Sequence, residues 1–278
     1  MKLKFWGVRG SIPVCGREYL KYGGDTACVE VRDAAGALTL VDAGTGIRRI
    51  GKQLAEQGVN GCNLLLTHAH WDHVMGFPFF LPLYRKNFTL RIVGCQPAQE
   101  AVRNMVANVM RAPNFPVELE SLAAKLEFEP ACGTGRLGGL DMEAVPLSHP
   151  NGGNGYVFRE NGKMFVFLTD NELNHHHHGG LTLAEYAKIC KGADVLVHDA
   201  DYQPAEYSRR EGWGHSTWEM ALELAREAGV KRLGLYHHNQ DRTDGDVDKI
   251  VEECKRKAAE SGAKIGIFAA AQDMEIQL

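Results

Sequence analysis

The sequence has no apolar run that approaches the ~18–20 residues of a membrane-spanning helix. Its start, residues 1–6, is too short and too charged for a secretory signal peptide. The seven cysteines are odd in number, and no two of them are spaced as a Cys-x-x-Cys pair. A disulfide scaffold and a cysteine-zinc site are therefore not expected. Together these absences predict a cytoplasmic protein with reduced thiols.

Positive charge is not in excess. Lysine and arginine total 31 residues against 35 aspartates and glutamates, which gives a net charge of −4. Non-specific nucleic-acid binding needs a basic surface that displaces counterions, so this balance gives it no support, although it does not exclude a local basic patch. Low-complexity linkers and internal repeats are also missing. We therefore expect one globular domain over residues 1–278.

Secondary structure is predicted from short apolar runs that alternate with amphipathic segments. The expected strands are 3–6, 27–32, 38–42, 63–67, 89–93, 125–129, 142–146, 155–159, 164–169, 195–198, 232–235 and 264–268. The expected helices are 47–57, 97–109, 183–190, 217–228 and 245–261. Asn161-Gly162 predicts a tight hairpin turn between two of the strands. This order suits two sheets packed together with helices outside.

Histidine is unusually frequent, with 12 copies, several of them in tight groups. An apolar strand runs directly into a turn that carries His68, His70, Asp72 and His73. Neutral imidazole nitrogen and carboxylate oxygen are the usual protein ligands of zinc and similar metals. Four such groups within six residues can hardly serve one tetrahedral ion and leave an open position. They can serve two adjacent ions, with two ligands each.

This His-x-His-x-Asp-His segment resembles the signature of the metallo-β-lactamase superfamily. The segment 40–46 resembles the strand and turn that precede the signature, and His149, Asp170 and His237 match the three later ligands in order. The resemblance implies an α/β (α+β) fold, an αββα four-layer sandwich of two mixed sheets with helices outside. It also implies two divalent metal ions. One is held by His68, His70 and His149, the other by Asp72, His73 and His237, and Asp170 bridges both.

The later ligands also suit a site by their positions, because each falls at or just beyond the end of a predicted strand. His238 competes with His237 for the last ligand position. Successive side chains of a strand point to opposite faces, so the two histidines should face opposite ways. We prefer His237, because the family pattern places the ligand directly after the apolar strand.

A second motif narrows the family. His215-Ser216-Thr217 resembles the His-Ser-Thr segment of ribonuclease Z and its phosphodiesterase relatives. The resemblance implies that His215 protonates the leaving oxygen and that an acidic residue pairs with it. We assign that acidic role to Asp199, with Asp201 and His198 as neighbouring alternatives. Ser216 or Thr217 also suits the N-cap of the following helix.

The activity implied is hydrolysis of a small or cyclic phosphodiester by a metal-bridging hydroxide, since a metal pair lowers the pKa of bound water. The proposed catalytic residues are Asp72, Asp199 and His215. Zinc is the preferred metal, with manganese or iron as alternatives. The alternative functions are an RNA-processing nuclease like ribonuclease Z, a thioesterase or lactonase, and a non-catalytic accessory protein of the same fold.

The branch of the family is indicated by further segments. Ribonuclease Z carries a long Gly/Pro-rich arm that clamps tRNA, and no such arm is visible here. Residues 7–11 and 22–28 resemble the small phosphodiesterase-like members. With the negative net charge, this argues against a nucleic-acid partner and for a small-molecule phosphodiester. No membrane partner is expected, and the resemblance allows a homodimer.

Several other residues lie near the motifs. Trp71 and Trp213 flank proposed site residues, where they either stack on a nucleobase or pack around the loops. Arg9 either contacts phosphate or is exposed or ion-paired. Residues 77–81 are expected to form a buried wall. The run His175–His178 is expected to be a solvated loop, with a site rim or a third metal site as alternatives.

Overall fold

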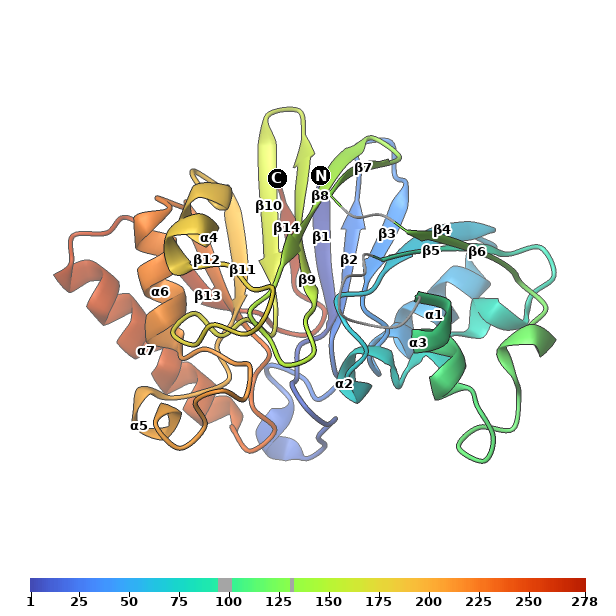
Figure 1. The fold of residues 1–278 in the computed structure, drawn as a ribbon, viewed down its shortest axis with the longest axis horizontal. Helices are drawn as coiled ribbons and strands as arrows, with labels where there is room; N and C mark the ends of the chain where they lie inside the picture. Colours follow the sequence, from blue (N-terminus) through green and yellow to red (C-terminus); the bar gives the residue numbers. More distant parts are fainter. Residues whose placement is uncertain (95–101, 131–132) are drawn as a thin grey trace.

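In the computed structural model, which describes residues 1–94, 102–130 and 133–278, two seven-stranded sheets lie face to face. Helices cover the outer side of each sheet, so that four layers follow one another (Figure 1). Each sheet pairs four of its strands in parallel and adds three antiparallel ones, so both are mixed. The αββα sandwich expected from the sequence is confirmed.

The first sheet comes from the N-terminal half, with one strand from the C-terminus. Its order is β14 (Glu275–Gln277), β1 (Lys2–Gly7), β2 (Cys28–Arg32), β3 (Leu38–Val41), β4 (Gly61–Leu65), β5 (Thr89–Gly94) and β6 (Lys125–Pro130). The helices on its outer side are α1 (Ile47–Glu56) and α3 (Val102–Val109). Short elements complete this half: α2 (Trp71–Val74), η1 (Arg17–Tyr19), η2 (Phe77–Phe79), η3 (Leu81–Tyr84) and η4 (Leu119–Ser121).

The second sheet comes from the C-terminal half. Its order is β13 (Gly266–Ala269), β12 (Arg232–Tyr236), β11 (Val195–Asp199), β10 (Lys163–Leu168), β9 (Asn154–Glu160), β8 (Leu140–Pro146) and β7 (Thr134–Leu137). Its helices are α4 (Leu183–Ile189), α5 (Pro204–Tyr207), α6 (Trp218–Glu227) and α7 (Asp244–Glu260). Thr182, Thr217 and Thr243 cap α4, α6 and α7 with their side chains, which satisfies helix N–H groups that have no partner within the helix.

Side-chain alternation divides the core into layers. In β10, Phe165 and Phe167 point toward the first sheet, while Val166 and Leu168 lie under the outer helices. This is the period of two that a strand buried on both faces requires. The carboxyl ends of the parallel strands lie at the same end of each sheet. The residues that follow β3, β4, β10, β11 and β12 are therefore brought to the same end of the sandwich.

Most predicted elements are present, with ends shifted by one or a few residues. Asn161 and Gly162 adopt φ angles of 50° and 74° between β9 and β10, which confirms the hairpin. The helix expected over 97–109 is described only from Val102 onward, because residues 95–101 lie outside the described residues. Strands β7 and β14 were not predicted. Both are short, and each is the edge strand of its sheet, where pairing with the one neighbouring strand decides the conformation.

The structure also describes cysteines and helices, for which the sequence predicts reduced thiols and no membrane span. The five cysteines among the described residues, Cys15, Cys28, Cys62, Cys190 and Cys254, are all free thiols. Within the same ranges, no helix has both the length and the apolar character to cross a membrane.

Candidate active site

The sequence-predicted site residues converge at the edge of the sandwich where the parallel strands end. They fall into three overlapping groups whose candidate ligand atoms lie within 4.8 Å of one another. The groups are His68, His70, His149 and Asp170; Asp72, His73, Asp170 and His237; and Asp170, Asp199, His215 and His237. The nine residues come from both sheets, so the site exists only when the two sheets pack together.

Asp170 lies at the centre of these groups. Its carboxylate oxygens are 3.6 Å from Nε2 of His68, 3.3 Å from Nε2 of His73, 3.9 Å from Nε2 of His149 and 3.4 Å from Nε2 of His237. The carboxylate is buried and accepts a hydrogen bond of 2.6 Å from the Thr169 hydroxyl. One buried carboxylate is thus surrounded by four imidazole nitrogens, an arrangement suited to a bridging ligand.

The same four histidines are oriented by hydrogen bonds on their other ring nitrogen, Nδ1. The acceptors are Thr67 Oγ1 for His68 (3.0 Å), Asp42 Oδ2 for His73 (2.8 Å), Gly214 O for His149 (2.9 Å) and Asp201 Oδ2 for His237 (3.3 Å). Such bonds fix the orientation of each ring and turn Nε2 toward the site, as is usual for histidines that bind metal. His70 differs, because its Nδ1 lies 3.0 Å from Nε2 of His149 and so faces the site itself.

The residues present fit divalent metal ions. Nε2 of His68 and Nε2 of His73 are buried and make no well-oriented hydrogen bond within the part of the chain that the structure describes. An unsatisfied buried polar atom costs about 1–3 kcal/mol, so a ligand for these atoms is expected. Burial lowers the pKa of His68, and it lowers the pKa of His149 to about 3, so both rings are neutral and offer a lone pair. Imidazole nitrogen with carboxylate oxygen is a donor set for zinc, manganese or iron.

Asp72 joins the second group to the N-terminal loop. Its Oδ2 atom lies 3.0 Å from Nε2 of His237 and 3.3 Å from Nε2 of His73. The backbone N–H of Ser11 donates a 2.8 Å hydrogen bond to the same oxygen. This bond explains how the segment that begins at Gly7 contributes to the site without supplying a side chain to it.

His215 pairs with Asp199. Nδ1 of His215 donates a 2.6 Å hydrogen bond to Oδ2 of Asp199, and the backbone N–H of Ser216 donates to the other oxygen at 3.2 Å. Burial alone would lower the pKa of His215, but the charge of Asp199 outweighs it and raises that pKa to about 9. The ring is therefore protonated near neutral pH. It stacks on His237, with ring centroids 4.8 Å apart.

The two alternatives to Asp199 make other contacts. Asp201 accepts from His237, as described above, and its second oxygen accepts a 2.8 Å hydrogen bond from Asn239. His198 donates from Nδ1 to the Asp199 carbonyl and accepts from Asn171 at Nε2. Neither side chain is hydrogen-bonded to His215, so the pairing with Asp199 is the one the structure contains.

His237 and His238 face different surroundings, as the sequence predicts, although neither residue belongs to a strand. Nε2 of His238 donates to the carbonyl of Ala270 at 2.8 Å, outside the metal-candidate groups. Both residues lie beyond β12, which ends at Tyr236, so the expected alternation along a strand does not apply to them. His237 has a left-handed backbone with a φ of 58°. Asp42 and Asp170 share this left-handed backbone, with φ of 66° and 53°. Such strain in non-glycine residues is concentrated at functional sites.

Glu172 is a buried residue that the sequence analysis missed. Its Oε1 accepts from the Tyr207 hydroxyl at 2.9 Å and from the Gly212 N–H at 2.7 Å. Its Oε2 accepts from the Gly214 N–H at 2.7 Å and from Nε2 of His177 at 2.8 Å. Glu172 thereby fixes the loop that presents the Gly214 carbonyl to His149. No local sequence signal marks it, because its partners lie elsewhere in the chain.

The structure also bears on what is expected of the histidine run, of Arg9 and of residues 77–81. The solvated loop expected for the histidine run holds for His176 and His178, which are exposed, but not for His177, which is hydrogen-bonded to Glu172. For Arg9 the ion-paired alternative holds, because its Nη2 lies 4.0 Å from Oδ1 of Asp244. The side chain is fully buried and also donates to the carbonyls of Gly23, Asn239 and Arg242. The wall expected for residues 77–81 is only partly buried, because Phe79 and Leu81 are exposed.

Comparisons with known proteins show which family the chain belongs to. The family model of the beta-lactamase superfamily domain matches residues 39–238. A ribonuclease Z from Haloarcula marismortui is 25% identical, with 92% of this chain and 91% of the relative aligned. A ribonuclease Z from Pyrococcus abyssi is 26% identical, with 73% of this chain and 77% of the relative aligned.

Solved structures share the fold. A diphosphatase from the PhnP family superposes with a TM-score of 0.69 at 19% identity, covering 100% of this chain and 97% of that one. The short form of human tRNase Z gives a TM-score of 0.65 at 20% identity, covering 100% and 99%. The chain therefore belongs to the beta-lactamase superfamily, with the metallo-β-lactamase fold and in the branch that contains ribonuclease Z.

Proposed function

We propose that the protein is a dinuclear metal-dependent phosphodiesterase that hydrolyses a small or cyclic phosphodiester. The observation that carries the proposal is the His215–Asp199 pair, held at 2.6 Å beside the groups centred on Asp170. An alkoxide leaving group needs a proton, and a protonated imidazole at this position can supply it. A protein that only bound metal or nucleotide would need no such group.

The residues that would hold the metals follow from the two ligand groups. His68, His70 and His149 would hold one ion, Asp72, His73 and His237 the other, and Asp170 would contribute to both. Two divalent ions bound there, zinc preferentially, would neutralise phosphate charge and make water a stronger nucleophile near neutral pH. Asp72 would serve both as ligand and, through the Ser11 N–H, as the contact that positions the N-terminal loop.

The protonation step is assigned to His215. Because Asp199 occupies Nδ1, Nε2 is the nitrogen left to face a substrate. An imidazolium there stabilises negative charge that builds on the leaving oxygen and then transfers its proton to that oxygen. Asp199 keeps the ring in the tautomer and orientation that this transfer requires. A positioned acid of this kind contributes about 10²–10⁴-fold to the rate.

RNA is the second candidate substrate. The curated relatives are named as ribonucleases, which makes the expectation of no nucleic-acid partner doubtful. Two features of this chain still favour a small substrate. Its net charge is −4, and the segment between β10 and β11 is short and contains α4.

One set of assays tests these alternatives. We expect the zinc-loaded protein to hydrolyse bis(p-nitrophenyl) phosphate and cyclic nucleotides, and chelation to abolish both activities. A structured RNA is assayed in parallel over a range of salt, because an RNA enzyme should lose activity steeply as salt rises. Thioester and lactone substrates are included for the acyl alternatives. Metal-loaded protein that hydrolyses no phosphodiester would contradict the proposal.

A further inference from the structure

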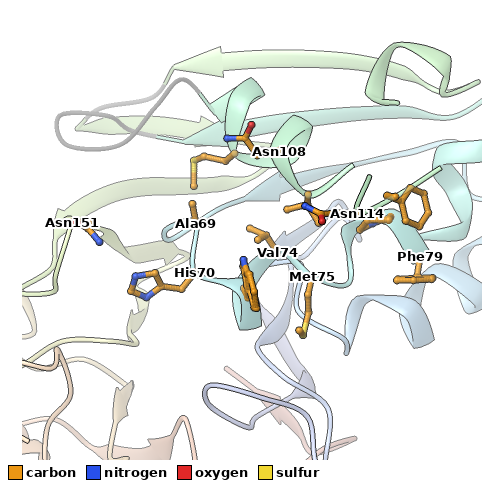
Figure 2. A pocket seen from close by; sticks show the side chains of 13 residues that line it. Ala69, His70, Val74, Met75, Phe79, Asn108, Asn114 and Asn151 are labelled. Carbon is orange, nitrogen blue, oxygen red and sulfur yellow. The ribbon is translucent and has the colours of Figure 1, made fainter. Parts of the chain in front are cut away.

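A cavity of about 670 Å³ opens beside the candidate metal groups (Figure 2). Its volume lies within the range of roughly 300–1,000 Å³ that is usual for small-molecule sites. His70 belongs both to the wall of the cavity and to the group with His68, His149 and Asp170. A substrate whose phosphate lies at the metal groups can therefore extend its organic part into the cavity.

The apolar part of the cavity wall includes the aromatic rings of Trp71, Phe79 and Phe115 beside aliphatic and methionine side chains. Trp71 is 78% exposed and Phe79 is 58% exposed, two of the large apolar side chains that face solvent. Phe79 is supported by Phe115, since their ring centroids lie 5.7 Å apart in an edge-to-face arrangement. Exposed aromatic side chains gathered in a concave site are typical of surfaces that bind a ligand.

The polar groups of the cavity are amides. Asn108, Asn114 and Asn151 contribute to its lining, and Figure 2 shows their side chains around the same space as His70 and Phe79. Of the described residues that line the cavity, none is Lys, Arg, Asp or Glu. An amide both donates and accepts hydrogen bonds, which matches the edge of a nucleobase. A polyanionic backbone would instead need Lys or Arg contacts.

We propose that this cavity binds the nucleobase of a nucleoside phosphodiester, with Trp71 as the stacking surface and the asparagine amides on the edge of the base. This inference rests on the proposed function, because the phosphate must lie at the metal groups for the base to reach the cavity. It narrows the substrate from phosphodiesters in general to those that carry a base on one side.

Two esters with the same leaving group test the proposal. The p-nitrophenyl ester of thymidine 5′-phosphate carries a base, and methyl p-nitrophenyl phosphate does not. We expect kcat/KM of the wild-type protein to favour the thymidine ester by at least about tenfold, because a base–aromatic stack is typically worth that much or more. Trp71→Ala should lower kcat/KM for the thymidine ester much more than kcat/KM for the methyl ester, so that most of this preference is lost.

A matched variant controls for a general effect of removing a surface tryptophan. Trp213 is 64% exposed and does not line the cavity, so Trp213→Ala should keep the preference. Loss of the preference in Trp213→Ala but not in Trp71→Ala would overturn the proposal, and so would equal kcat/KM for the two esters with the wild-type protein.

Binding separates failure of this inference from failure of the proposed function. If neither ester is hydrolysed, the phosphodiesterase proposal fails, and calorimetry with thymidine 5′-monophosphate and methyl phosphate still decides the cavity. Tighter binding of the nucleotide by at least about tenfold, lost in Trp71→Ala, supports the base site. Equal affinity of the zinc-loaded protein for the two phosphates, or an unchanged ratio in the variant, overturns it.

Discussion

Asp199 and Asp201 lie two residues apart at the end of β11, and each orients a different histidine of the site. Asp199 accepts from Nδ1 of His215 at 2.6 Å, whereas Asp201 accepts from Nδ1 of His237 at 3.3 Å. One carboxylate therefore holds the proposed acid, and the other holds a proposed metal ligand. This division makes the two roles separable by matched substitutions.

The first prediction uses that pair of aspartates. Asp199→Asn removes the charge that keeps His215 protonated, so kcat for a cyclic nucleotide should fall by about 10²–10⁴-fold with metal content unchanged. Asp201→Asn should instead weaken zinc affinity by about 10–100-fold, the usual effect of losing a partner of a metal-bound histidine. Metal analysis and steady-state kinetics of both variants check this. Equal zinc loss in the two variants would contradict the division of roles.

The second prediction compares the neighbouring histidines. Zinc that binds the folded protein should raise Tm, since a ligand at 100 times its Kd stabilises by about 2.7 kcal/mol. His237→Asn should remove much of this zinc-dependent rise. His238→Asn should retain it, because His238 is bonded to the Ala270 carbonyl outside the metal groups. Differential scanning calorimetry with and without zinc measures the shift. A reversed pattern would make His238 the ligand.

The third prediction concerns Glu172. Both of its oxygens accept from backbone N–H groups, so Glu172→Gln places an amide nitrogen against one of them. The free energy of unfolding should fall by about 1–3 kcal/mol, and kcat should fall because the Gly214 loop is no longer fixed. Glu211→Gln is the control, because Glu211 is exposed and lies 3.6 Å from the His175 ring. Urea unfolding and kinetics of both variants give the answer, and equal effects would refute the special role of Glu172.

The fourth prediction is a pH dependence remote from the site. Burial alone would raise the pKa of Asp194, but hydrogen bonds from Lys231 Nζ (2.7 Å) and the Met164 N–H (2.9 Å) outweigh it and lower that pKa. A folded pKa below the unfolded value of about 3.9 stabilises the protein above that pH, and the effect is lost as pH falls through the lowered pKa.

Asp194→Asn should therefore cost about 1–2 kcal/mol near pH 7 and less near pH 3. Urea unfolding at the two pH values measures this difference. Glu56→Gln, which removes an exposed pair with Lys52, should change stability little at either pH. A cost for Asp194→Asn that is the same at both pH values would show that the carboxylate charge is not what stabilises this region.

The residues that converge at the candidate site could be predicted from the sequence because their signal is local. His68, His70, Asp72 and His73 stand together within six residues, and the later ligands each follow an apolar strand. The fold follows for the same reason, since alternation along strands such as β10 marks both of its buried faces. In each case the pattern that carries the prediction lies within one short segment of the chain.

The residues that orient the site could not be predicted in this way. Asp42 orients His73 and Glu172 orients the Gly214 loop through contacts between segments 31 and 42 residues apart. Arg9 shows the same limit, because its carbonyl partners at Asn239 and Arg242 lie at the far end of the chain. The left-handed backbone of His237 is likewise set by packing and not by its own residue type.

The most direct test of the proposed mechanism is how the effect of His215→Ala depends on the leaving group. Wild-type and variant proteins with equal zinc content are compared on a cyclic nucleotide, whose alkoxide must be protonated, and on bis(p-nitrophenyl) phosphate, whose phenolate leaves without a proton. We expect kcat to fall by about 10²–10⁴-fold on the cyclic nucleotide and far less on the phenyl ester. An equal fall on both substrates would show that His215 does not act as the acid.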